Sequence, residues 1–232
     1  MTKKGIHSVF LLFFCFSLLA QNKNDSLSVN FHLEFNKLPL ELNKKYVSES
    51  NDTLMVETFR CYISNIQIQY GDNSVFTQKS SYHLLDFDNP NSFQIPISKK
   101  SDKMISKVTF NIGIDSLTNT AGAMAGDLDP IKGMYWAWQS GYINMKIEGK
   151  STSCKTKQNA FQFHIGGYLQ PYYAMRQMKF DWGKKADDDI SIGIDLNPFF
   201  SNLELKENNS VMIPGKEAMK LANDSTKMFY AQ

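Results

Sequence analysis

The chain has 232 residues, 21% of them charged, and a formal net charge of +2. Its basic residues form no extended run, which argues against nucleic acid as a partner, because such binding depends on a clustered positive surface. A chain of this length can form one all-β domain without dividing.

The N-terminus has the order of a secretory signal peptide. Lys3 and Lys4 precede an apolar run of about eleven residues, whereas a membrane-spanning helix needs roughly 20. We expect residues 1–20 to be removed, leaving 21–232 as one domain of nearly zero net charge; an uncleaved membrane anchor is the alternative. No later stretch is apolar enough to span a bilayer, so a periplasmic or secreted protein is expected.

Alternation of apolar and polar residues is the strongest local signal and predicts β-strands. Its phase slips at Ser64-Asn65, which predicts a β-bulge inside a long strand. Strand after strand with polar turns between them favours an all-β fold, a two-sheet antiparallel β-sandwich with long loops. The alternating segments are 29–35, 59–63, 66–70, 82–86, 108–114, 143–147, 161–165, 178–182 and 190–196.

Helix signals are scarce. Apolar residues at helical spacing after Pro214-Gly215 predict a short C-terminal helix within 216–229. The segment 117–134 is rich in small residues and is interrupted by Pro130 and Gly133. A loop of this length in a compact domain is usually functional or disordered.

Two cysteines, Cys61 and Cys154, remain after export. An oxidising compartment permits a bridge between them, but one pair is no disulfide framework, and Cys61 lies among apolar residues as a buried free thiol would. No G-x-S-x-G, P-loop, G-x-G-x-x-G or H-E-x-x-H motif is present. We therefore predict that the chain is not an enzyme.

The histidines are the main metal-ligand candidates, because imidazole binds copper and zinc. His32 alternates with polar residues and is expected to be exposed. His83 lies in a short apolar strand, and His164 closes a strand just before Gly166-Gly167. A single histidine on a strand is more often a surface or core residue than a ligand.

An aromatic segment and an acidic loop lie near one another in the sequence. Trp136 and Trp138 share one face of an extended backbone, and in the simplest interpretation they seal one end of the core. Asp115, Asp127 and Asp129 could hold calcium, although caps and turns explain such aspartates more often.

Seven short motifs follow one another in order along the chain. They are Phe59-Arg-Cys-Tyr-Ile-Ser-Asn65, Ser81-Tyr-His-Leu-Leu-Asp86, Ile112-Gly-Ile-Asp-Ser116, Leu128-Asp-Pro130, Gly133-Met-Tyr-Trp-Ala-Trp138, Ser140-Gly-Tyr-Ile143 and Phe163-His-Ile-Gly-Gly167. One such motif alone would carry little weight, but the seven together resemble the MbnP-like family of periplasmic copper-binding proteins. The resemblance extends over nearly all of the chain after residue 20.

The resemblance implies an all-β domain that captures, stores or delivers copper. It implies two histidine ligands, His83 and His164 by motif, and a tryptophan oxidised to kynurenine, either Trp136 or Trp138. It also implies a partner that performs the oxidation, a diheme cytochrome c peroxidase of the MbnH type. The alternative function is a metal-free secreted β-sandwich that binds glycan or protein, for which the tyrosine-rich run 168–173 is suited.

Chain order adds a geometric expectation. Trp138 leads into the strand from Gly141, and His164 ends the next strand along the chain. Adjacent antiparallel strands would place the tryptophans and His164 at the same end of one sheet. If His83 and His164 share one metal ion, we also expect these two side chains to converge.

Overall fold

The computed structural model describes residues 25–139 and 141–232. The predicted signal peptide, residues 1–20, lies outside the described residues. Among the described residues, no helix has the length and apolar character needed to cross a membrane.

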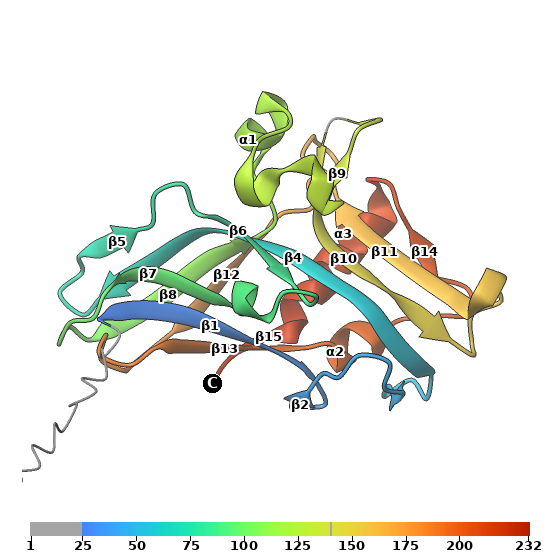
Figure 1. Cartoon of the computed structure of the whole chain (residues 1–232), viewed down its shortest axis with the longest axis horizontal. Helices are drawn as coiled ribbons and strands as arrows, with labels where there is room; N and C mark the ends of the chain where they lie inside the picture. Colours follow the sequence, from blue (N-terminus) through green and yellow to red (C-terminus); the bar gives the residue numbers. More distant parts are fainter. Residues whose placement is uncertain (1–24, 140) are drawn as a thin grey trace, which may run out of the picture.

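A curled sheet of ten strands forms the larger layer of the described chain (Figure 1). Its longest strand, β4, pairs with most of the others. The central path is β12 (Arg176–Asp181), β8 (Ile105–Ile112), β4 (Thr53–Tyr70), β10 (Gly141–Ser151), β11 (Ala160–Gly166) and β14 (Ser210–Val211); β3 (Tyr46–Val47), β5 (Val75–Thr77) and β6 (Tyr82–Asp86) pair with β4, and β9 (Tyr135–Trp136) pairs with β10.

The smaller sheet packs against the larger one, and the predicted β-sandwich is confirmed. Its strands are β15 (Phe229–Ala231), β13 (Ile190–Asp195), β1 (Ser26–Phe35), β2 (Leu38–Pro39) and β7 (Gln94–Lys99). Most pairs are antiparallel as predicted, but β1 with β13 and β11 with β14 are parallel. Alternation within a strand fixes which side chains are buried and carries no information on the direction of the neighbouring strand.

The core lies between the inner faces of the two sheets. Phe110 of β8 meets Phe31 of β1 edge to face, with ring centroids 5.5 Å apart, so this pair joins the layers. Phe161 and Phe163 are fully buried in the same core. Burying each such side chain stabilises the fold by about 1.5–3 kcal/mol. Cys61 belongs to the same core and is a free thiol, as is buried Cys154; burial raises the pKa of the Cys61 thiol.

The predicted bulge in β4 is confirmed. Ser64 pairs with Asn111 and Gln67 with Thr109, so two residues of β4 lie opposite one of β8. Asn65, at the bulge, has a positive φ of 51°. The hydroxyl of Ser81 accepts a hydrogen bond from the Ile66 amide, which holds the start of β6 against the bulge.

The C-terminal helix is confirmed as α3, Lys216–Ser225. It ends earlier than the sequence pattern predicts, because a 3-10 turn follows and Phe229 begins β15. The shorter helices are α1 (Ser116–Ala121) and α2 (Asn197–Phe200), and the 3-10 turns are η1 (Pro90–Phe93), η2 (Gly126–Leu128), η3 (Pro130–Lys132), η4 (Lys157–Asn159) and η5 (Thr226–Met228).

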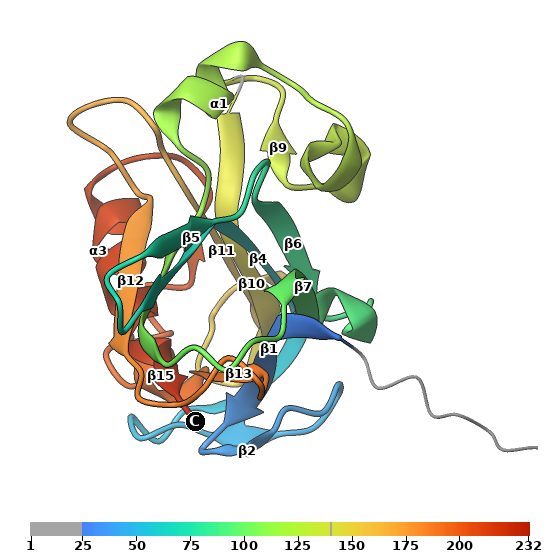
Figure 2. The same cartoon turned by 90° about the vertical axis from the view of Figure 1, so that its left-hand side faces the viewer.

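The segment expected to be a long loop is a folded cap. We define the cap as residues 113–139; it contains α1, η2, η3 and β9. It covers part of the outer face of the larger sheet, on the side away from β1 and β13 (Figure 2). The cap therefore creates a second, separate interior on that face.

Candidate functional site beneath the cap

A row of polar side chains crosses four strands of the larger sheet on its outer face. His164 of β11 lies opposite Lys146 of β10, Lys146 lies opposite Arg60 of β4, and Arg60 lies opposite Asp86 of β6. Residues directly opposite one another in a sheet share a face. The four side chains therefore form one line beside the cap.

His164 is the buried end of this row. The residue is 7% exposed, and its Nε2 lies 2.7 Å from Oε1 of Glu148, on the neighbouring strand. The hydrogen bond from His164 lowers the pKa of Glu148 below its ordinary value, against the effect of burial. The pair is thus a shielded imidazole beside a carboxylate, the two donor types that many metal sites combine.

The positive residues of the row bind the cap. Arg60 lies 3.0 Å from the Asp86 carboxylate and donates to the carbonyl of Lys132 at 3.3 Å. Lys146 donates to the carbonyl of Gly133 at 2.7 Å. Burial lowers the pKa of Lys146; the Glu148 charge opposes this shift, and the Arg60 charge adds to it. These bonds anchor the η3 end of the cap over the row.

Trp136 lies at the same end of the sheet as His164, in agreement with the geometric expectation. Trp136 pairs with Gly141, and its ring lies against Gly166, where an added Cβ would come within 2.6 Å of the ring. Gly166 follows His164 by two residues and so shares its face. Trp138 is 65% exposed, and its ring centroid is 5.8 Å from that of Trp136.

His83 lies on the other face of the same sheet, and the expected convergence with His164 is wrong. His83 pairs with core residue Ile63, whereas Asp86, three residues later on β6, belongs to the outer row. Strands β4 and β10 also separate the two histidines. Nε2 of His83 lies 2.8 Å from Oε1 of Gln78, and burial lowers the pKa of His83 below its ordinary value.

The three aspartates hold the cap together and do not converge on one point. Asp115 accepts a hydrogen bond from the Thr118 amide at the start of α1, and Asp129 accepts one from the Ile131 amide at the start of η3. Asp127 accepts from the Leu84 amide of β6. Over the described ranges no group of three or more His, Cys, Asp or Glu residues could hold a metal ion. The contacts therefore support the interpretation of these aspartates as caps and turn residues, and not as calcium ligands.

The fold and the family-model match agree on the relatives of this chain. The model of the MbnP family matches residues 24–213. The chain belongs to the MbnP family. Among solved structures, MbnP from Methylosinus trichosporium aligns with a TM-score of 0.59 and 14% identity over 75% of this chain and 77% of that one. A likeness at this identity shows the shared fold alone. No curated protein matches.

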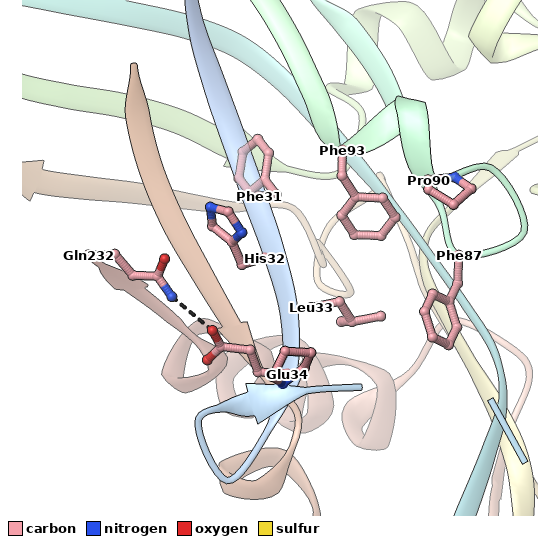
Figure 3. A pocket seen from close by; sticks show the side chains of 9 residues that line it. Phe31, His32, Leu33, Glu34, Phe87, Pro90, Phe93 and Gln232 are labelled. Atoms are coloured by element: carbon pink, nitrogen blue, oxygen red, sulfur yellow. Dashed lines mark hydrogen bonds between the residues drawn. The ribbon is translucent and has the colours of Figure 1, made fainter. Parts of the chain in front are cut away.

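A hollow in this MbnP-family protein lies beside β1, where no sequence pattern predicted one. Figure 3 shows His32 and Glu34 on one side of β1 and Phe87 and Phe93 on the other. The cavity that these residues line has a volume of about 320 Å³. His32 is exposed as predicted, but Glu34, which alternates with it, is 7% exposed. Its carboxylate accepts hydrogen bonds from Gln232 and from Tyr230. No local signal marks these partners, because they are nearly 200 residues away in sequence.

Proposed function

We propose that the chain is an exported, copper-associated protein that captures or delivers copper on the outer face of its larger sheet. The observation that supports the site is the buried His164 paired with the Glu148 carboxylate, on the same strand and face as Gly166, against which Trp136 packs. Membership of the MbnP family supports the metal, and the N-terminal pattern of residues 1–20 supports export.

The residues around His164 fit a weak copper site better than a closed one. His83 and His164 cannot both reach a single ion without movement of the sheet, since metal–nitrogen bonds are about 2 Å long and the two side chains point to opposite faces. His164 would supply a neutral imidazole, and Glu148 an oxygen donor. Two protein donors favour an exchangeable ion, which suits capture and delivery more than storage.

Trp136 and Trp138 remain the candidates for oxidation to kynurenine. Trp136 lies beside the His164 strand, whereas Trp138 exposes its ring and packs on Trp136. We propose that an MbnH-type diheme peroxidase would approach from the Trp138 side, because that ring is open to a partner. The product would lie next to the proposed copper site.

Metal analysis of protein exported by its native host tests this function. We expect bound copper in the wild type and in His83→Ala, and its loss in His164→Ala; His32→Ala is the exposed control. Intact mass with peptide mapping would assign any modified tryptophan. Copper retained in His164→Ala would place the site elsewhere. Copper-free wild type with unmodified tryptophans would leave the metal-free alternative, binding of glycan or protein.

A further inference from the structure

Four segments of the chain that carry no charged side chain meet at the cap end of the molecule. Residues 116–126, 133–145, 158–175 and 208–215 contain no Asp, Glu, Lys or Arg, although 21% of the whole chain is charged. They comprise α1 with the loop after it, the segment that leads through β9 into β10, β11 with the loop after it, and the residues from β14 to the start of α3. The charged residues of the chain are therefore placed elsewhere.

Contacts around Tyr168 hold these segments side by side. The hydroxyl of Ser116, at the start of α1, donates to the Tyr168 carbonyl at 2.7 Å. A Cβ added to Gly141, at the start of β10, would come within 2.8 Å of the Tyr168 ring. A Cβ added to Gly167 would come within 3.2 Å of Pro214. One continuous surface therefore includes parts of all four segments.

This surface exposes large apolar side chains. Leu117 is 81% exposed and Ile213 is 61% exposed, and Trp138 is similarly open to solvent. Single exposed apolar residues are ordinary, but several that gather in one place mark an interaction site. Figures 1 and 2 show α1 and β9 projecting beyond the sheets, so these side chains stand on separate tips of a convex end. We define the uncharged end by its exposed apolar residues, which are Leu117, Met124, Trp138, Leu169, Tyr172, Met212 and Ile213.

The shape and the missing charge favour a lipid bilayer over a second protein as the partner of the uncharged end. A stable protein interface buries about 800 Å² on each partner, which separate convex tips do not supply against a rigid surface. Protein partners also use charged groups to fix their register, and these four segments contain none. A fluid bilayer adapts to separate tips, and binding strengthens with the apolar area that they bury. Tryptophan and tyrosine, here Trp138 and Tyr172, are enriched where hydrocarbon meets water.

We propose that the uncharged end inserts its apolar side chains into the surface of a bilayer with zwitterionic headgroups. Attraction to anionic lipids depends on clusters of Lys or Arg beside the membrane, and the four segments have no such residue. The insertion is therefore driven by apolar burial alone. Because Trp138 belongs to the uncharged end, a redox partner would reach this ring only in molecules that are free of the membrane. The membrane proposal itself needs no bound copper.

Flotation with phosphatidylcholine vesicles tests the proposal on the protein without residues 1–20. We expect a vesicle-bound fraction that does not change when NaCl is raised from about 0.1 to 0.5 M, because no ion pair is screened. Tryptophan emission should shift to shorter wavelength on binding, and Trp138→Phe should abolish this shift. Leu117→Ser combined with Ile213→Ser should weaken partitioning about tenfold, because two apolar side chains no longer insert.

Leu38→Ser combined with Val47→Ser is the matched control. These side chains are 66% and 56% exposed but lie on β2 and β3, away from the cap (Figure 1), so this variant should bind vesicles as the wild type does. All four substitutions are at exposed positions, so thermal unfolding without lipid should be unchanged.

Three results would overturn the proposal: wild type that does not float with the vesicles, two double variants that bind equally well, or release of the protein by salt. It is also overturned if sedimentation velocity shows a dimer that is lost in the Leu117→Ser, Ile213→Ser variant while no vesicles bind. A second copy of the chain would then cover the uncharged end.

Discussion

The two faces of the larger sheet are stabilised in different ways. The inner face packs phenylalanine and aliphatic side chains against the smaller sheet, and its residues belong to one continuous cluster. The outer face has a second, smaller apolar cluster beneath the cap, next to the row from His164 to Asp86. The burial of apolar surface stabilises the inner face without requiring a fixed orientation of the side chains. The cap, in contrast, depends on hydrogen bonds with fixed geometry. The proposed copper site lies on the outer face, where directional hydrogen bonds hold the cap in place.

Buried polar side chains connect the cap to the sheet. The hydroxyl of Tyr62 on β4 donates to the carbonyl of Asp127 at 2.8 Å, and that of Tyr142 on β10 donates to the carbonyl of Leu128 at 3.0 Å. Asn119 is 2% exposed; its Nδ2 donates to the carbonyls of Ile114 and Asp115 just before α1, and its Oδ1 accepts from the Tyr142 amide of β10. Each bond is individually modest, about 0.5–1.5 kcal/mol, but leaving a buried partner unpaired costs more.

Truncation in the inner core should give the largest effect. Phe161→Ala removes a fully buried ring that contacts Phe163 and Phe200, and we expect a loss of about 3–5 kcal/mol in the free energy of unfolding. Urea denaturation measures it. Ile131→Ala, at an 89% exposed cap residue, is the control and should change stability by less than about 0.5 kcal/mol. Equal losses in the two variants would contradict the inner face as the main source of stability.

Loosening the cap should give an intermediate and local effect. Asn119→Ala leaves the Tyr142 amide and the Ile114 carbonyl without this partner, and we expect about 1–3 kcal/mol of destabilisation. Hydrogen exchange should accelerate in 113–139 before it does in β4 and β8, because the cap opens as a separate unit. Leu117→Ala, exposed on the same helix, is the matched control. Uniform acceleration across both sheets would show that cap and core unfold together.

The same contrast explains how far the sequence could predict the structure. Inner-face residues such as Phe161 and Phe163 follow strict alternation, because burial on one face fixes the phase of a strand. The slip of that phase at Ser64-Asn65 was enough to predict the β4 bulge. The short helix α1 has no comparable pattern. It is held by the Asp115 cap and by Asn119, and local propensity is weak over six residues.

To predict the candidate site, one has to know which strands pair and in which register, and the alternation of apolar and polar residues does not give this information. The neighbourhood of Trp136 and His164 could be predicted, because β10 and β11 are consecutive antiparallel strands. The positions of His83 and Glu34 could not. His83 depends on the register of β6 against β4, and Glu34 on a distant strand that brings Tyr230 to it. Motif resemblance supplied residues, but only strand register showed on which face each one lies.

The smallest predicted effect is a pH dependence of the free energy of unfolding that arises from the burial of His83 on the inner face. Burial lowers the pKa of His83 below the ordinary 6.5, with Asp127 opposing the shift. The unfolded chain therefore binds a proton at this site more readily than the folded one, and stability falls as pH decreases through and below 6.5. Glu148 and Asp115 have lowered pKa values and act in a more acidic window, below their ordinary 4.5 and 3.8.

Replacing His83 by glutamine should remove this part of the pH dependence. We expect urea unfolding of His83→Gln to show a flatter slope than the wild type between roughly pH 7 and 5, with a difference of less than about 1 kcal/mol because the side chain is only partly buried. His32→Gln, at an exposed histidine, is the control. An unchanged slope in His83→Gln would show that His83 lies in a more open environment than its inner-face position and its contact with Gln78 indicate.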